Sequence, residues 1–412
     1  MAKKTIVMVA TFDTKGQECL YVKNLMLKNG YDVITVDVGT GVRGELVFTP
    51  DHPKEEVVKA GGSSMEEILA LGKVGKEIRI MEIMTAGAIK ICQQLYDSGK
   101  LDGVISLGGT FGTALGTNIM RSLPFSVPKV MLSTVASGDT KSFVATSNIV
   151  MVPSVADIIG LNPITETVLN RAAGAVMGMA AAAEKVKPSS KPLIGVTTLG
   201  GTQKCVEQVR KRLEKKGYEF VVFHASGVGG KAMEELVEQK IITGIFDLSP
   251  NEVVDHMYKG WGDAGPTRLE IAGREGVPQL ISAGNLDHIV YTSPDKIPEQ
   301  FRSHYVHRHG PSIFTLRTKK KDMEEIGWVI VEKLNKSRGP TAVILSLKGI
   351  SVLDLVDKDF VDNEANYALF EVLKKNLKPE IEVKEVNAHI NDELFAEEAA
   401  NMLLHLMSQG RS

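Results

Sequence analysis

The chain has 412 residues, a length that predicts two or three domains. Its 48 Lys and Arg residues nearly balance its 50 Asp and Glu residues, and only 6% of the residues are aromatic. This argues against a nucleic-acid-binding or membrane-surface protein, because such proteins carry basic patches, and single-stranded nucleic acid also needs aromatic rings for base stacking. Apolar residues make up 43% of the chain and charged residues 24%, as in ordinary globular domains.

The cysteines and the apolar runs predict a cytoplasmic protein. Cys19, Cys92 and Cys205 are far apart and odd in number, which indicates reduced thiols rather than disulfides or metal ligands. The apolar run at the N-terminus is short and ends in a polar loop, so we interpret it as a strand and not as a targeting signal. The longest tract of small apolar residues, Ala172–Ala183, is shorter than the ~18 residues of a membrane span.

The chain opens with a predicted β-α-β unit. Thr5–Ala10 is a short β-branched run typical of a strand buried on both faces, and the polar loop Thr11–Gly16 follows it. Residues 17–29 predict a helix, with Gly30 at its C-terminal cap. Val33–Val38 predicts the second strand.

The same order of elements returns in the second half of the chain. Leu193–Thr197 predicts a strand, a helix runs to Lys216, and Glu219–His224 predicts the next strand. Two later stretches are also similar between the halves: Leu101–Leu107 resembles Ile242–Leu248, and Ser126–Leu132 resembles Gly276–Ile281. We therefore predict an α/β fold of two Rossmann-like doubly wound domains that arose by internal duplication.

A linker divides the two predicted domains. Val186–Pro192 contains two prolines, two serines and charged residues, a composition typical of a linker. The domains are then 1–186, which we expect to bind the nucleotide, and 187–412. Alternating elements complete the second sheet, with helices and strands predicted at 323–334, 341–347, 364–377, 381–386 and 394–407.

A glycine-rich loop after the strand 101–107 is the strongest candidate for ligand binding. Glycines let the backbone approach a phosphate, and free amides at a helix N-terminus attract an anion. The loop has neither the Walker pattern nor Gly-x-Gly-x-x-Gly, and a tight turn for close helix–sheet packing is the alternative. The candidate ligand-binding residues in it are Gly108, Gly109, Thr110, Gly112 and Thr113.

Neighbouring strand ends supply further walls of the predicted pocket, because ligands bind at the carboxyl ends of strands in open α/β sheets. The loop after the strand 129–132 offers Ser133, Thr134, Ser137 and Gly138. The loop after the first strand offers three more residues: Asp13 to hold a metal ion or accept a hydrogen bond from a hydroxyl, Thr14, and Lys15 to neutralise phosphate. A solvated helix start with Asp13 as its cap is the alternative. Asp37 ends the second strand, where dinucleotide-binding folds place a ribose-binding carboxylate.

The second domain contains two further candidate sites. Gly227–Gly230 precedes a helix and is either a second anion site or a loop at a domain interface. Polar groups from three separate segments, predicted to lie near strand ends, form a candidate catalytic cluster. Its members are Arg317, His307, His389 and Asp392. The alternatives are an ordinary polar loop around His307 and a structural ion pair at Arg317.

Several stretches together resemble the Tm-one-like ATP-binding domain family, named after a plant inhibitor of tobamoviruses. They include TFDTK (11–15), SLGGTFGT (106–113), PKVMLSTVASG (128–138), TSNIVMVPSVAD (146–157), AGPTRLE (264–270), GNLD (284–287), FTLRT (314–318) and HINDELF (389–395). The resemblance covers essentially the whole chain. It implies two Rossmann-like subdomains with ATP and Mg²⁺ in the first. In the plant member the domain is fused to a barrel-like domain, so a separate partner protein is one expectation here.

These observations lead to two functional hypotheses. In the first, ATP binds in domain one and is used by an enzyme that acts on a small substrate in the interdomain cleft. In the second, the chain is a nucleotide-sensing binding or regulatory protein without turnover. A dinucleotide oxidoreductase is disfavoured because the usual fingerprint is missing. We expect a homo-oligomer, because symmetric oligomers are common.

Overall fold

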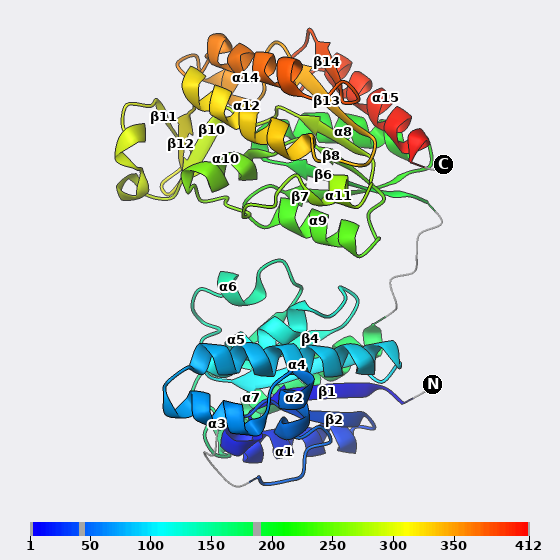
Figure 1. Cartoon of the computed structure of the whole chain (residues 1–412), viewed down its shortest axis with the longest axis vertical. Helices are drawn as coiled ribbons and strands as arrows, with labels where there is room; N and C mark the ends of the chain where they lie inside the picture. Colours follow the sequence, from blue (N-terminus) through cyan, green and yellow to red (C-terminus); the bar gives the residue numbers. More distant parts are fainter. Residues whose placement is uncertain (1–2, 41–45, 184–190, 411–412) are drawn as a thin grey trace. The chain divides into compact units, whose positions relative to one another are not determined.

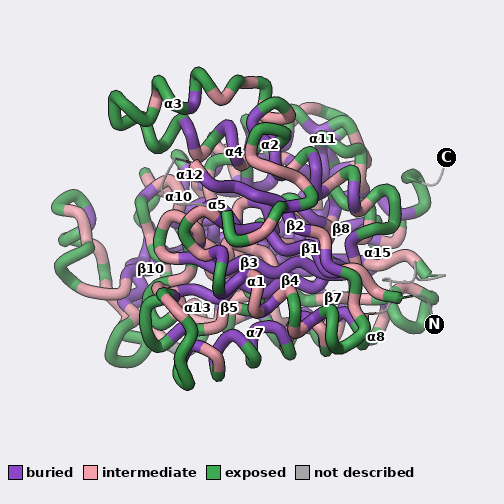
Figure 2. Tube along the Cα trace, turned by 90° about the horizontal axis from the view of Figure 1, so that it is seen from below, coloured by how far each residue is buried: buried purple, intermediate pink, exposed green. Residues whose placement is uncertain are grey.

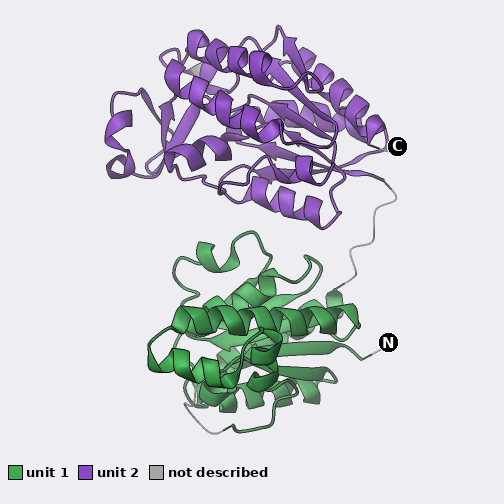
Figure 3. Cartoon of the chain, in the orientation of Figure 1, with its two compact units in different colours: residues 1–187 green, residues 188–412 purple. Residues whose placement is uncertain are grey.

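The computed structural model describes residues 3–40, 46–183 and 191–410. The chain forms two compact units, residues 1–187 and 188–412 (Figures 1 and 3). Both units have an α/β fold with a parallel sheet flanked by helices, which confirms the predicted fold class. Residues 186–190 of the predicted linker lie outside the described residues. No helix among the described residues is both long and apolar enough to cross a membrane.

Unit 1 is built on one five-stranded parallel sheet with the order β2-β1-β3-β4-β5. Its strands are β1 (Thr5–Ala10), β2 (Asp32–Asp37), β3 (Gly103–Gly108), β4 (Lys129–Ser133) and β5 (Val150–Pro153). The three central strands β1, β3 and β4 are almost wholly buried. Their runs of Val, Ile, Leu and Met are what a sheet covered on both faces requires.

Helices cover both faces of this sheet. One face packs against α1 (Phe12–Lys28) and α7 (Pro163–Ala182), whose buried side chains meet Ile6 and Met8. The other face packs against α2, α4 and α5, and Val7 and Val9 point into that second core. The helices on and beside that face are α2 (Lys54–Ala60), α3 (Met65–Lys73), α4 (Glu77–Asp97), α5 (Thr110–Arg121) and the short α6 (Lys141–Val144).

Unit 2 contains a six-stranded parallel sheet with the order β14-β13-β9-β8-β6-β7. Its strands are β6 (Leu193–Thr198), β7 (Glu219–His224), β8 (Gly244–Asp247), β9 (Gln279–Ser282), β13 (Thr341–Ser346) and β14 (Glu382–Val386). The helices are α8 (Gln203–Glu214), α9 (Gly229–Glu238), α10 (Asn251–Tyr258), α11 (Ile271–Arg274), α12 (Lys320–Leu334), α13 (Leu353–Val356), α14 (Asn363–Asn376) and α15 (Glu393–Gln409). Short 3₁₀ turns occupy 200–202, 294–296 and 299–301.

A small antiparallel sheet in unit 2 is an element that the sequence analysis missed. It has the order β10-β12-β11, formed by His288–Tyr291, Phe314–Arg317 and Val306–Arg308. These strands have only three or four residues each, too short for an alternating pattern to stand out. The insertion lies between β9 and α12 and carries two of the predicted catalytic residues, His307 and Arg317.

The two parallel sheets share one topology. In each, the first strand lies between the second and the third, and the fourth follows the third at the next position. The segments that resemble each other in sequence occupy equivalent places, since β3 corresponds to β8 and β4 to β9. This is the arrangement that an internal duplication produces.

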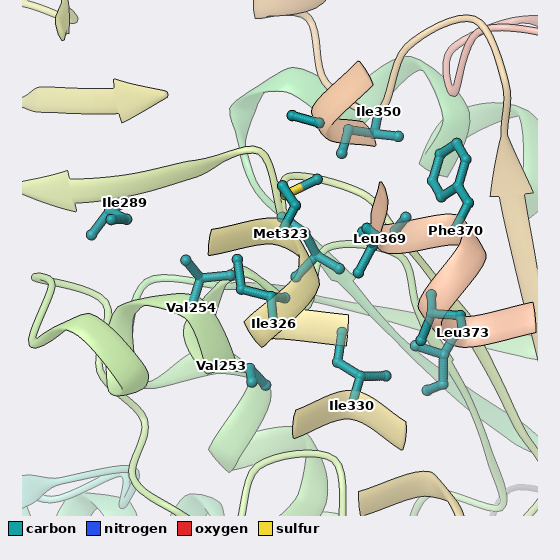
Figure 4. Close-up of a cluster of buried hydrophobic side chains, with 14 of the residues drawn as sticks. Val253, Val254, Ile289, Met323, Ile326, Ile330, Ile350, Leu369, Phe370 and Leu373 are labelled. Carbon is teal, nitrogen blue, oxygen red and sulfur yellow. The ribbon is translucent and has the colours of Figure 1, made fainter. Parts of the chain in front are cut away.

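Buried strands lie at the centre of both units, and exposed residues gather on the outer helices and loops (Figure 2). In unit 2 the largest core cluster joins α10 and the small sheet to α12 and α14. Figure 4 shows Val254, Ile326 and Leu369 from three of these helices pointing into it.

One predicted boundary near the candidate site was wrong. Helix α1 begins at Phe12, inside the predicted loop Thr11–Gly16, and the backbone leaves helical values at Lys15 (φ −126°, ψ 21°). Thr11 caps the helix in an extended conformation; its hydroxyl bonds the hydroxyl of Thr14 at 2.8 Å and no helix amide. The polar run is therefore a distorted first helical turn, and its side chains are held in place rather than carried on a free loop.

Candidate functional site

The strand order of unit 1 creates a crevice between β1 and β3. From β1 the chain moves to β2 on one side and then returns to β3 on the other, and β1 pairs with both. Helices leave the carboxyl ends of β1 and β3 toward opposite faces, and such a switch point is where open α/β sheets bind ligands. A cavity of ≈ 280 Å³ lies there, lined by Thr11, Asp13, Thr14, Lys15, Thr40, Glu77, Ile80, Gly108, Gly109, Thr110, Phe111 and Gly112.

The N-terminus of α5 forms one wall of this pocket. Gly109 caps the helix with an extended backbone and no side chain to bond the first amides. The first amides of a helix have no partner within it, so they are available to an acceptor in the pocket. Gly108 has a packing role, because a Cβ atom there would lie 2.8 Å from Cα of Gly112. A Cβ atom on Gly109 would contact only Thr134 Oγ1, at 3.7 Å.

The charged groups of the pocket are mainly acidic. Asp13, from the first turn of α1, and Glu77, the first residue of α4, both line it. Lys15 also lines it, but its Nζ donates a hydrogen bond to the main-chain oxygen of Ile158 at 2.5 Å. The pocket therefore combines helix amides that suit an anion with carboxylates that repel one unless a cation lies between them.

Five lining residues were not predicted as site residues. Thr11 and Phe111 belong to stretches that the sequence analysis singled out, so proximity to the motifs could have suggested them. Thr40, Glu77 and Ile80 come from the loop after β2 and from α4. Thr40 lies three residues after β2, so its strand end could have suggested it. No sequence pattern marks Glu77 and Ile80, because only packing of α4 against the sheet brings them to the strand ends.

Asp37, expected to bind a ribose, is not among the residues that line the pocket. It is fully buried, and its Oδ1 accepts hydrogen bonds from the amides of Phe12, at 3.3 Å, and Gly39, at 2.9 Å. Burial, together with the charge of Asp13, raises the pKa of Asp37. Its role is to join the start of α1 to the turn after β2, behind the pocket wall.

The loop after β4 contributes less than expected. The hydroxyls of Thr113 and Ser133 are both buried and bond each other at 2.6 Å, so they hold α5 against β4. Thr134 approaches Gly109, whereas Ser137 and Gly138 are exposed on the following turn. None of these residues lines the cavity. The cavity is lined by residues at the ends of β1 and β3, by Thr40 after β2, and by Glu77 and Ile80 of α4.

The second glycine-rich loop, Gly227–Gly230, is filled by the protein's own carboxylate. Oε1 of Glu252, in α10, accepts hydrogen bonds from the amides of Gly227, at 2.8 Å, and Gly230, at 3.3 Å. A Cβ atom on Gly230 would lie 2.0 Å from Oε2 of Glu252. The loop binds an anion as its sequence suggests, but that anion is internal, so we do not retain it as a second ligand site.

Arg268 neutralises this carboxylate within a buried cluster. Its Nε lies 2.8 Å from Oε2 of Glu252, and its Nη1 lies 2.6 Å from Oδ2 of Asp247 and 3.6 Å from Oε1 of Glu234. All four side chains are at most 2% exposed. One guanidinium thus faces three carboxylates, and burial raises the pKa of Glu234 to about 7 despite the pull of Arg268.

Arg317, predicted as catalytic, is bound entirely by the protein. It is 4% exposed, and its guanidinium donates hydrogen bonds of 2.7–3.2 Å. The acceptors are the main-chain oxygens of Asp287, Thr318, Phe360 and Asp362, Oγ1 of Thr318 and Oδ1 of Asn366. Five N–H groups with six acceptors leave no donor for a substrate. Arg317 therefore has a structural role, but it acts through main-chain oxygens, a hydroxyl and an amide oxygen and not through the ion pair named as the alternative.

The other three members of the predicted catalytic cluster also have structural partners. Nε2 of His389 bonds the main-chain oxygen of Ser351 at 2.9 Å, and burial lowers the pKa of His389. Oδ2 of Asp392 accepts from the amide of His389, just before α15. Nδ1 of His307 lies 2.7 Å from Asp357 at the surface. These contacts give the three residues structural roles, and no catalytic role is assigned to them.

A buried polar network that the sequence analysis missed surrounds Arg317. Asp287 bonds Nδ1 of His288 at 2.7 Å and Oγ of Ser351 at 2.5 Å. Burial alone would raise the pKa of Asp287, but these hydrogen bonds lower it. Burial, aided by the charge of Asp287, raises the pKa of neighbouring Asp354 to about 6. Among the described residues, no three His, Cys, Asp or Glu side chains lie together as metal ligands would.

Comparison with known proteins assigns the family. The N-terminal domain of the uncharacterised protein family UPF0261 matches residues 4–185, and the C-terminal domain of the same family matches residues 191–407. The chain belongs to this family. A UPF0261 protein of Clostridium tetani is 39% identical over 407 residues, covering 98% of this chain and all of the relative. One from Mesorhizobium japonicum is 34% identical over 97% of this chain and 98% of its own length.

The tomato ToMV resistance protein Tm-1(GCR237) is also a relative, so the expected kinship with the plant proteins is confirmed. It is 38% identical over 322 residues, which are 76% of this chain but only 43% of the plant protein. Among solved structures, a putative UDP-N-acetylglucosamine 2-epimerase from Listeria monocytogenes aligns at 12% identity over 98% of this chain and 95% of its own. Its TM-score of 0.20 is too low to support any argument.

Proposed function

We propose that unit 1 binds a phosphorylated nucleotide, with ATP as the first candidate, in the pocket between the ends of β1 and β3. The observation that carries this proposal is the open N-terminus of α5 at a topological switch point, bordered by Gly108 and Gly109. Main-chain amides and the positive end of the helix dipole attract phosphate oxygens there. Thr14 and Thr110 line the same cavity; the hydroxyl of Thr110 can bond a further oxygen, whereas that of Thr14 already bonds Thr11.

The acidic side chains of the pocket favour a ligand that arrives with Mg²⁺. Asp13 and Glu77 supply the oxygen ligands that Mg²⁺ prefers, and two carboxylates near phosphate repel it without a cation. Bound Mg²⁺ neutralises phosphate charge and polarises the phosphoryl group. The residues present therefore fit a magnesium–nucleotide complex better than a free nucleotide.

The size of the cavity limits how the nucleotide is held. At ≈ 280 Å³ it is at the lower end of the ~300–1,000 Å³ range of small-molecule pockets. The phosphates and ribose would fill it, and the base would extend beyond it. Base selectivity is then weaker than phosphate selectivity, so other nucleoside triphosphates should compete with ATP.

A binding or sensing role without turnover is the second candidate. The four residues predicted to be catalytic in unit 2 are engaged in structural contacts, and the described residues that line the pocket in unit 1 include no histidine or cysteine. The name of the plant relative describes resistance to a virus, and this chain spans less than half of that protein. An enzyme that uses ATP would need the carboxylate of Asp13 or Glu77 to position or activate the acceptor.

The test is a calorimetric titration of the full chain with ATP, with and without Mg²⁺, followed by analysis of the products. We expect binding that weakens when Mg²⁺ is removed. Gly109→Val should weaken it at least about tenfold, because a β-branched side chain stiffens the backbone and crowds the helix amides. Gly200→Val, at a glycine with no atom within 4 Å of its Cβ position, is the matched control in unit 2.

Each result has a clear meaning. Unchanged affinity in folded Gly109→Val would remove the α5 loop from the site. Absence of ATP binding by the wild type, with Mg²⁺ present, would overturn the proposed function. Release of ADP and phosphate would identify an enzyme, whereas binding without any product would favour the sensing role.

A further inference from the structure

Lys15 connects the pocket to a loop far along the chain. Its side chain lines the pocket, yet its Nζ bonds the main-chain oxygen of Ile158 at 2.5 Å and lies 3.7 Å from Oδ1 of Asp157. Both partners lie in Ser154–Gly160, which joins β5 to α7 and which we name the β5–α7 loop. The Lys15 side chain is 14% exposed, so this contact is shielded from water on most sides.

The β5–α7 loop is strained next to this contact. Val155 has a φ of +65°, a region that β-branched residues rarely adopt. The amide of Ala156 donates to the oxygen of Ser154 at 2.6 Å, which closes a tight three-residue turn around Val155. Val155 is 81% exposed, so burial of its side chain does not offset the strain. Such a conformation persists only where the surrounding structure holds it.

Other contacts fix the far end of the loop. The side chain of Ile158 is 2% exposed in the core formed with α1 and α7, and Oε1 of Glu18 accepts a hydrogen bond from the amide of Gly160 at 2.5 Å. Ser154 is also fixed, since it is 3% exposed and its amide donates to the main-chain oxygen of Ser133 at 3.1 Å, so the part that can move is Val155–Asp157. The Lys15 ammonium contacts the loop between the strained turn and the fixed end, at Asp157 and Ile158, and the Lys15 side chain also lines the pocket.

We propose that Lys15 is a ligand-operated latch: when a phosphorylated ligand enters the pocket, the ammonium turns from Ile158 and Asp157 to the phosphate, and the turn at Val155 relaxes. This inference rests on the proposed function. A neutral carbonyl oxygen and a carboxylate that is 63% exposed attract the ammonium less than the multiple charges of a phosphate in a confined pocket. Binding in unit 1 thus changes the surface of the β5–α7 loop.

The first part of the test needs no ligand. Hydrogen exchange measured by mass spectrometry should show that Lys15→Met speeds exchange in peptides covering 154–157 about fivefold, as the loss of one hydrogen bond implies. Lys15→Arg, which keeps a cation that can reach the carbonyl, should behave as the wild type. Lys23→Met is the matched control, since Lys23 is also a partly buried α1 lysine and lies near Asp51, outside this loop. Equal exchange in Lys15→Met and the wild type would overturn the latch.

The second part adds saturating Mg²⁺ and ATP, with binding followed by calorimetry on the same samples. The wild type should show faster exchange in 154–157 when ATP is bound, and Lys15→Met should show no further increase. ATP binding with unchanged or slower exchange in this segment would overturn the latch and leave the proposed function intact. Absence of ATP binding by the wild type would overturn the proposed function and the latch together.

Discussion

Two glycine-rich helix starts in this chain present their amides to different partners. At the start of α5, Gly109 and its neighbours border an open cavity. At the start of α9, the amides of Gly227 and Gly230 bond Glu252, which Arg268 neutralises in turn. Both loops offer the same chemistry, a set of main-chain donors at the positive end of a helix.

The difference teaches what a glycine pattern can predict. Glycines and a following helix predict that amides will seek an anion, and both loops obey this. Whether the anion is a ligand depends on the side chain that packing places opposite the loop. In unit 2, packing places the buried carboxylate of Glu252 against the loop amides. In unit 1, the loop faces a cavity that Asp13 and Glu77 also line.

The largest expected effect is on the stability of unit 2 and comes from removing Arg268, the partner of the Glu252 carboxylate that bonds the Gly227–Gly230 loop. Arg268→Met would leave Glu234, Asp247 and Glu252 buried without their partner, and breaking such a pair costs about 3–5 kcal/mol. Chemical unfolding of the full chain, followed by circular dichroism, should show that loss in the transition of unit 2. Arg274→Met, at an arginine whose side chain is 52% exposed, is the control and should change stability little. A loss below ~1 kcal/mol would show that the cluster is not held by Arg268.

The buried carboxylates around Arg268 should also make the stability of unit 2 depend on pH. Because the pKa of Glu234 is raised to about 7, the folded state holds its proton more tightly than the unfolded state, whose pKa is near 4.5. The free energy of unfolding then falls as pH rises from about 4.5 to about 7, by up to about 1.4 kcal/mol per pH unit. Glu234→Gln should flatten this fall, since an amide oxygen can still accept from the amide of Leu269. Unfolding curves of the wild type and Glu234→Gln at pH 5, 6, 7 and 8 measure this difference. The same dependence of stability on pH in both proteins would contradict a raised pKa of Glu234.

The smallest effect separates the two glycines of the open loop. Gly108→Ala places a Cβ atom 2.8 Å from the backbone of α5, and overpacking of this kind costs about 1–3 kcal/mol. Gly109→Ala meets only a hydroxyl at 3.7 Å, so the fold should tolerate it. The transition of unit 1 in chemical unfolding measures both variants. Equal losses would mean that Gly109, like Gly108, is needed for packing, and would weaken it as a probe of the pocket.

Most of the fold could be predicted because its signals are local. Runs such as Thr5–Ala10 and Leu193–Thr197 are continuous and rich in β-branched residues. The ends of both predicted strands agree with the observed ends to within one residue. The similar segments of the two halves also predicted equivalent strands in two sheets. The small sheet β10-β12-β11 escaped because its strands are short, and α1 was predicted to begin too late because Thr11–Gly16 is polar.

The candidate site was predictable only in part. The stretches that carry Asp13, Thr14, Lys15 and Gly108–Gly112 could be found in the sequence, since strand-to-helix loops of glycine, threonine and charge are where α/β sheets bind ligands. The side chains and main-chain groups that each of these residues contacts could not be predicted from the sequence. Glu77 enters the pocket by packing of α4, Asp37 is turned inward to bond amides, and Arg317 is enclosed by main-chain oxygens from four residues.

Local residue patterns thus determined where this chain forms strands, helices and anion-seeking loops, because backbone propensity and hydrophobic period act over a few neighbouring residues. Tertiary structure alone decided which of those groups remain open to a ligand. Glu252 lies opposite Gly227 because α10 packs there, and Lys15 reaches Ile158 because the β5–α7 loop returns past α1. A buried donor or acceptor bonds whatever group packing brings within reach, and that group can lie more than 100 residues away.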